Sequence, residues 1–149
     1  MTEDEIEELD NIEEALIESG MPLEDIGRHY SLFLLDLIGS ITPVNESNED
    51  IAKVTHLLRN ICRPHFLEKH DLKEERIMLW DIEKRYREEL PEFSLMARCA
   101  IYCCANKARW SSSNSSEETP MFFMVHTAEK INSKYVKVLI EHFKKLIPS

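Results

Sequence analysis

Glycine is scarce in this sequence. Only three glycines, Gly20, Gly27 and Gly39, occur among the 149 residues. Loops that cradle a phosphate group need closely spaced glycines, because the backbone must approach the ligand without a Cβ atom in the way. The sequence therefore disfavours the nucleotide-binding folds that depend on glycine-rich loops.

Long apolar segments are also missing. The longest apolar run, LFLLDLI at residues 32–38, contains Asp36 and is far shorter than the roughly 20 residues that cross a bilayer. The first residues are acidic, whereas a secretory signal begins with basic residues and continues with an apolar region. We expect a cytoplasmic protein that does not enter a membrane.

Positive charge is nearly absent from the first third of the chain. Residues 1–50 hold 15 acids and a single base, Arg28, whereas residues 51–149 hold 13 acids and 17 bases. The net charge is therefore −14 in the first segment and +4 in the second. An acidic region of this kind repels nucleic acids and anionic lipids and accelerates encounters with cationic proteins. We expect a basic protein as the partner, and neither nucleic acid nor membrane.

Apolar residues recur at spacings of three and four along most of the chain, which is the period of an amphipathic helix. We predict an all-α fold over residues 1–149, a single compact bundle of roughly six to eight helices. A central apolar helix is expected at about 92–109, followed by a serine-rich loop at 111–119. The other expected helices are 3–19, 22–38, 49–62, 71–90 and one or two helices from 120 to the end, where Asn132 and Ser133 mark the place of a division.

Several residues have the chemistry of helix ends. Thr2 can cap the first helix through its hydroxyl group. Pro64 should interrupt the third helix, because its ring removes a backbone donor and disfavours helical geometry at the residue before it. Asp71, with Glu74 three residues later, predicts a capping box that restarts the helix. The expected terminators of the first two helices are Gly20 and Gly39.

The cysteine positions are more typical of buried core residues than of a disulfide or a metal site. Cys99, Cys103 and Cys104 fall within six residues of one expected helix. Adjacent cysteines are poor disulfide partners, so we expect reduced thiols that are buried as small core residues. A second group, Cys62, His65 and His70, has a spacing that could supply three metal ligands, but no matching half follows, and we predict neither a metal nor a cofactor.

The stretch LRNICRPHF at residues 58–66 suggests an alternative function. Arg59, Asn60 and His65 resemble the R-N-x(n)-H signature of HEPN-type RNases, which are small all-α proteins. The resemblance implies that Arg59 would stabilise phosphate charge and that His65 would transfer a proton during attack by a 2′-hydroxyl. The other interpretation is that Arg59 is a solvated surface residue and that His65 lies in a turn.

The first helix concentrates the negative charge. Nine carboxylates and neither lysine nor arginine lie between Thr2 and Gly20. Like charges four residues apart, such as Glu14 and Glu18, are each unfavourable by about 0.2–0.5 kcal/mol. The helix dipole offsets this repulsion only in the first turn. Solubility is one explanation of such a helix, and a surface that binds a basic protein is the other.

The functional prediction follows from this charge and from the lack of a catalytic pattern. We expect a non-enzymatic acidic protein that neutralises a basic partner, most specifically an immunity protein or antitoxin that inhibits a nuclease toxin. Ile6, Leu9, Ile12, Leu16 and Ile17 are the expected buried stripe that holds the first helix to the core. The expected partner-binding residues are Glu7, Glu8, Asp10, Glu14, Glu18, Glu24 and Asp25.

Overall fold

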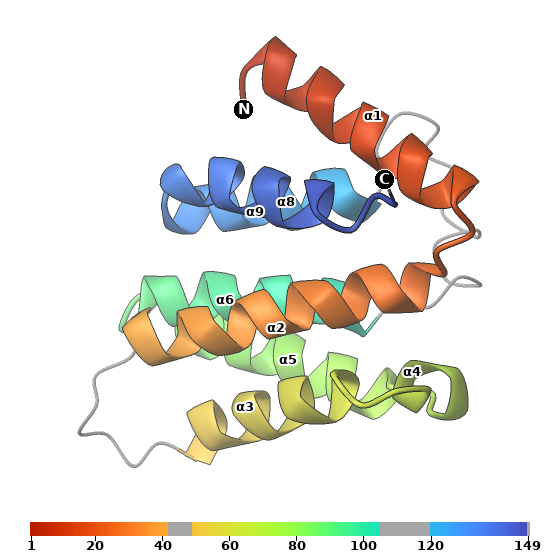
Figure 1. Ribbon diagram of the computed structural model, residues 1–149. Helices are drawn as coiled ribbons and strands as arrows, with labels where there is room; N and C mark the ends of the chain where they lie inside the picture. Colours follow the sequence, from red (N-terminus) through yellow and green to blue (C-terminus); the bar gives the residue numbers. More distant parts are fainter. Residues whose placement is uncertain (42–48, 105–119, 149) are drawn as a thin grey trace.

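The computed structural model describes residues 1–41, 49–104 and 120–148, and all regular structure in these residues is helical (Figure 1). The predicted all-α class is therefore confirmed. The serine-rich loop at 111–119 and the last residues of the expected central helix lie outside this range. The eight helices of the described part are α1 (Glu3–Glu18), α2 (Leu23–Ile41), α3 (Glu49–Ile61), α4 (Phe66–Lys69), α5 (Lys73–Arg85), α6 (Pro91–Cys103), α8 (Pro120–Ile131) and α9 (Lys134–Lys144).

Helix α6 is the centre of the bundle, as expected for the apolar helix predicted at about 92–109. It packs against α2, α3, α5 and α8. Its small side chains allow these neighbours to approach closely, while Phe93 and Met96 fill the space between them. The buried residues of α6 are Phe93, Ser94, Met96, Ala97, Cys99, Ala100, Ile101 and Cys103.

Helices α1 and α3 lie on opposite sides of the molecule. Figure 1 shows α1 crossing over α8 and α9 at one side, α2 and α6 in the middle, and α3 with the short α4 at the other side. The contacts agree, since α1 packs against α8 and α9 whereas α3 packs against α2, α5 and α6. The acidic first helix is thus an outer layer of the bundle with one side facing solvent.

Helix α1 has the ends that the sequence predicted. The Glu5 amide donates to Thr2 Oγ1 at 3.1 Å, and the Thr2 amide donates to Glu5 Oε1 at 2.9 Å, which completes a capping box. Gly20 follows the helix with a φ of 84°, a conformation that favours glycine. Ile17 was predicted to be buried and this is wrong, because its side chain is 63% exposed. One residue beyond buried Leu16, it is turned by about 100° away from the packed side.

Two other predicted helix ends are wrong. Helix α2 continues through Gly39 to Ile41, and Gly39 does not have a positive φ. Helix α5 starts at Lys73 without a side-chain cap, so the predicted capping box of Asp71 and Glu74 does not form. The carboxylate of Asp71 lies instead 3.5 Å from the guanidinium of Arg76.

The breaks after α3 and after α8 occur at the proline and polar residues that the sequence indicated. His65, directly after Pro64, has a φ of 65°, so the predicted interruption of α3 is confirmed. Asn132 and Ser133 divide the last segment into two helices, α8 and α9. None of the helices in the three described segments combines the length and the apolar character needed to cross a bilayer.

Candidate functional site

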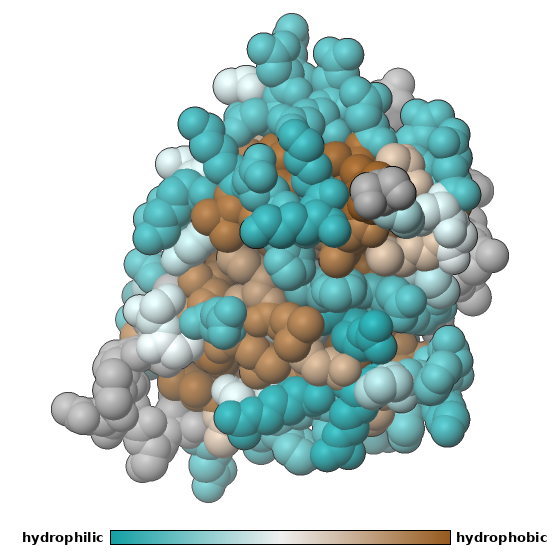
Figure 2. Space-filling view, viewed as in Figure 1, coloured by the Kyte–Doolittle hydropathy of each residue, from teal (hydrophilic) through white to brown (hydrophobic). Residues whose placement is uncertain are grey.

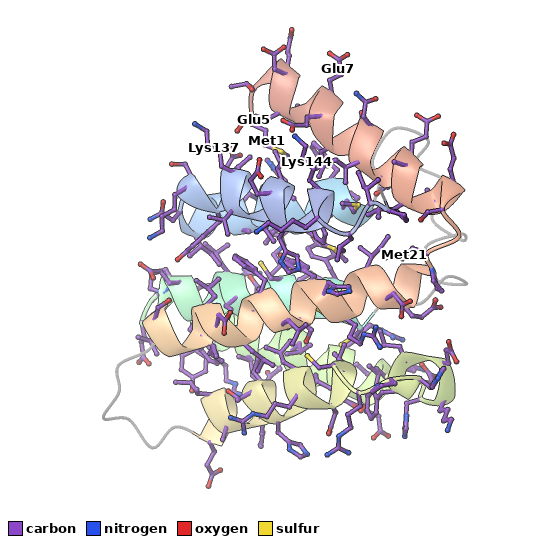
Figure 3. All side chains as sticks on the ribbon, viewed as in Figure 1. Met1, Glu5, Glu7, Met21, Lys137 and Lys144 are labelled. Carbon is purple, nitrogen blue, oxygen red and sulfur yellow. The ribbon has the colours of Figure 1, made fainter. Side chains whose placement is uncertain are left out.

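Five carboxylates line the outer side of α1. Glu3, Glu7, Asp10, Glu14 and Glu18 are all exposed and follow one another at spacings of three and four residues, which places them on one side of a helix. The opposite side buries Leu9, Ile12 and Leu16 against the bundle. Figure 3 shows Glu7 pointing away from α8 and α9. We call these five carboxylates the acidic face of α1.

The acidic face has no cation close by among the residues that the structure describes. None of its carboxylates forms an ion pair or a side-chain hydrogen bond with another described residue. The exposed Ile17 borders the face beside Glu14 and Glu18. The face therefore combines unneutralised negative charge with one apolar side chain in contact with solvent.

Other carboxylates of α1 have structural roles. The Glu8 carboxylate lies 3.5 Å from the ammonium of Lys144 in α9. Glu5 belongs to the capping box, and the backbone hydrogen bond from Thr2 lowers the pKa of its carboxyl group. Figure 3 shows Glu5 between α1 and α9, on the side where Lys137 and Lys144 lie. A lysine of α9, the last helix, thus offsets part of the negative charge of α1.

Glu13 is the carboxylate that sequence reasoning missed. It is only 8% exposed, and its Oε2 accepts a hydrogen bond at 3.2 Å from the backbone amide of Met121 in the first turn of α8. A carboxylate at a helix N-terminus is stabilised by the unpaired amides and by the helix dipole. The available signal was its position, four residues after Leu9 and three before Leu16, which places an acid within the apolar stripe.

Glu24 and Asp25 are separate from the acidic face. Both are partly buried at the start of α2, where they border a hollow of about 270 Å³. Arg28, Arg63 and His65 line the same hollow, and the carboxylate of Asp25 lies 3.6 Å from the guanidinium of Arg28. Asp25 therefore has a described cation close by, unlike the carboxylates of the acidic face, and Glu24 shares its hollow with two arginines and with Glu68.

The residues of the RNase alternative do not converge on one hollow. Arg59 lines a hollow of about 360 Å³ between α2 and α3, whereas His65 lines the hollow at the start of α2. The side chain of Asn60 lies 3.3 Å from His56 Nε2, and His65 Nδ1 lies 3.1 Å from the carboxylate of Glu68. The break at Pro64 turns His65 off the helix that carries Arg59.

The other histidine and cysteine candidates have local partners. His70 Nδ1 lies 2.9 Å from the carbonyl oxygen of Phe66, and the two rings stack with centroids 4.2 Å apart. Cys62, directly after the end of α3, is partly buried, whereas His65 is exposed. Within residues 1–41, 49–104 and 120–148, no three histidine, cysteine or acidic side chains lie together in a way that could hold a metal ion.

The three clustered cysteines are core residues, as predicted. Cys99, Cys103 and Cys104 are free thiols and are at most 2% exposed. Burial raises the pKa of Cys99 and of Cys104 to about 12. Burial also raises the pKa of Cys103 well above its ordinary value. Because a thiolate is the reactive form, these side chains are poor nucleophiles.

Comparison with known proteins gives no family assignment. No protein-family model, no curated protein and no solved structure matches this chain. The acidic face is therefore interpreted from its own geometry and charge.

Proposed function

We propose that this protein is a non-enzymatic binding protein that holds a basic protein on the acidic face of α1. The observation that supports the proposal is the division of eight of the nine α1 carboxylates into two groups. Glu5, Glu8 and Glu13 have partners within the fold, whereas the acidic face points to solvent without a described cation. The like-charge repulsion along that face lowers the stability of the helix, so helix stability does not explain these acids.

The internal contacts of α1 would make the face effective in binding. The capping box, the Glu8–Lys144 ion pair and the Glu13–Met121 hydrogen bond fix the helix on α8 and α9. A surface that is already rigid loses less conformational entropy when a partner binds. Opposite charge on the partner would accelerate the encounter, and Ile17 would add an apolar contact beside the ionic ones.

The class of partner follows from the charge of the face. Proteins with strongly cationic surfaces include nucleases, whose basic groups bind phosphates. A helix that presents carboxylates to those groups would compete with the nucleic acid. We therefore propose an immunity protein or antitoxin against a nuclease toxin as the most specific form of this function. Free buried thiols fit action in a reducing cytoplasm.

Partner capture from the native cells tests this proposal. The tagged wild-type protein and a variant with three charge reversals on the acidic face would be compared, with the bound proteins identified by mass spectrometry. We expect basic proteins on the wild type that are lost from the reversal variant. The reversals are Asp10→Lys, Glu14→Lys and Glu18→Lys.

A matched control separates a binding face from a change in net charge. Three exposed acids away from α1 have no described ion pair, so their reversal alters the total charge equally. This control variant should retain the basic partner. Capture of only acidic or neutral proteins, or equal capture of basic proteins by all three forms, would refute the proposal. The control reversals are Asp36→Lys, Glu88→Lys and Glu89→Lys.

A further inference from the structure

Two histidine rings meet where α2 approaches α9. The ring centres of His29 and His142 lie 5.8 Å apart, with the ring planes inclined by 59°. One helical turn further along α2, Phe33 contacts Tyr135 edge to face, with ring centres 5.6 Å apart. Residue numbers rise along α2 and fall along α9 between these two contacts, so the helices run antiparallel (Figure 1). We call His29 and His142 the histidine pair.

The residues next to the histidine pair are anchored in the core. Tyr30 is fully buried, and its hydroxyl donates to the carbonyl oxygen of Met124 in α8 at 2.8 Å. Phe143 is fully buried as well, whereas both histidines are only partly buried. Over α9 and α2, Figure 2 shows apolar surface interrupted by hydrophilic side chains. The pair is thus held in place from the core side and can be reached from solvent, and a preformed pair loses little conformational entropy when a ligand binds.

One nitrogen atom of the pair has no partner. His142 Nε2 is buried, and no described residue forms a hydrogen bond with it. Such an atom is unusual, because most buried polar atoms bind another protein group, a water molecule or an ion. Burial is the main cause that lowers the pKa of both side chains below the ordinary value of 6.5. Both imidazoles are therefore neutral at pH 7, about the pH of a cell, and the neutral ring is the form that binds a metal ion.

The separation of the two rings matches that of imidazoles on one metal ion. Two imidazoles whose nitrogens lie about 2.0–2.1 Å from a shared ion have ring centres roughly 5–6 Å apart. The 5.8 Å between the ring centres of the pair lies within this range. We propose that His29 and His142 bind one divalent transition-metal ion of the zinc, nickel and copper group, for which imidazole is a preferred ligand.

Water molecules would complete the coordination of this ion. The described residues place no third histidine, cysteine or carboxylate with the pair in a way that makes a larger metal site. Asp25, one turn before His29, favours a cation, whereas Arg28 and Lys145 oppose it. The guanidinium of Arg28 lies 3.6 Å from the carboxylate of Asp25, so these two charges offset each other. Two protein ligands in these surroundings predict an exchangeable ion that joins α2 to α9 and stabilises the fold while it is bound.

Metal titration of the full-length protein tests the proposal. Isothermal titration calorimetry would measure binding of Zn²⁺, and of Mg²⁺ as a control, after treatment with EDTA and dialysis. We expect equimolar binding of Zn²⁺ and none of Mg²⁺, because Mg²⁺ prefers oxygen ligands. His29→Phe and His142→Phe should each weaken Zn²⁺ binding at least tenfold. Zn²⁺ should also raise the thermal unfolding midpoint of the wild type but not of either variant.

A control variant separates the histidine pair from the other candidate ligands. Cys62→Ser with His65→Ala removes two of the three residues whose spacing in the sequence could supply metal ligands, and it should bind Zn²⁺ as the wild type does. Loss of binding in this control with retention in His142→Phe would overturn the proposal. No Zn²⁺ binding by the wild type, or equal binding by the wild type and both variants of the pair, would overturn it as well.

Nuclear magnetic resonance locates the ion without any substitution. Paramagnetic Ni²⁺ added to the wild-type protein should broaden the amide signals around residues 29 and 142 before those around residues 62–70. Because this measurement uses the unaltered fold, a variant that fails to fold does not affect it. Broadening first at residues 62–70 would overturn the proposal. The site lies apart from the acidic face of α1, so neither result bears on the proposed binding function.

Discussion

Adjacent carboxylates on α1 have opposite environments. Glu13 is buried and accepts the amide hydrogen of Met121, whereas Glu14 is exposed and belongs to the acidic face. Their neighbouring positions in one helix make the pair a direct comparison between a structural and a surface acid. The effect of removing each side chain should therefore differ although the chemical change is the same.

Replacing Glu13 should destabilise the fold. Glu13→Ala removes the acceptor at the start of α8 and should lower the free energy of unfolding by about 1–2 kcal/mol. Glu13→Gln keeps an acceptor oxygen and should lower it less. Glu14→Ala, the control, should change it by less than about 0.5 kcal/mol. Urea denaturation of the three variants measures this, and equal effects of Glu13→Ala and Glu14→Ala would show that the hydrogen bond does not stabilise α8.

His65 separates the binding interpretation from the RNase alternative. It pairs with Glu68 and lies in a different hollow from Arg59, so we expect neither the wild type nor His65→Ala to cleave RNA. A gel assay with labelled single-stranded RNA at high protein concentration measures this. Cleavage by the wild type that disappears in His65→Ala would contradict the prediction and favour the alternative.

At the scale of the helices, the ends that depend on neighbouring residues were easier to predict than the ends that depend on contacts between distant residues. The bounds of α1 follow from Thr2 and Gly20, which act within a few residues of their own positions. The start of α5 was mispredicted because Asp71 faces Arg76 instead of capping the helix. Gly39 permits a helix end without requiring one, and α2 continues past it.

The candidate site was also predictable only in part, because some of its contacts depend on residues that are distant in the sequence. Helical spacing alone indicates that Glu7, Asp10, Glu14 and Glu18 share one side of α1. The pairing of Glu8 with Lys144 depends on how α9 packs on α1, so no local pattern reveals it. The cations around Glu24 and Asp25 likewise come partly from the break after α3.

Two histidines couple stability to pH where α2 approaches α9. The rings of His29 and His142 lie 5.8 Å apart, and His142 Nε2 is buried without a hydrogen-bond partner. Burial is the main cause that lowers the pKa of both side chains, and nearby positive charge, including Lys145 beside His142, lowers it further. The folded protein therefore holds both rings in the neutral form more strongly than the unfolded chain does.

The expected sign is a loss of stability in acid. Below the ordinary histidine pKa of 6.5, the unfolded chain binds protons that the folded protein resists, so the free energy of unfolding should fall as the pH decreases toward the lowered values. His142→Phe removes one of these groups and should reduce that fall. Urea denaturation at a series of pH values between 7.5 and 5, about the range of histidine titration, measures it. The same slope in wild type and variant would contradict the assignment.

At the scale of the whole molecule, the negative charge is concentrated at one end of the sequence and on one side of the bundle. Residues 1–50 carry a net charge of −14, and nine of their 15 acids belong to α1. Helix α1 is an outer layer of the bundle (Figure 1), so its acidic face is open to a partner from solvent.

The affinity for the captured basic partner, measured at low and high salt, tests the binding function of the acidic face most directly. Reversing Asp10, Glu14 and Glu18 to lysine should weaken binding at least tenfold, about 1.4 kcal/mol, and should reduce its salt dependence. The control reversal of Asp36, Glu88 and Glu89 should leave affinity within about threefold, since exposed charges beyond a Debye length are largely screened. Unchanged affinity and an unchanged salt dependence in the α1 variant would contradict the proposal and assign the acidic face to solubility.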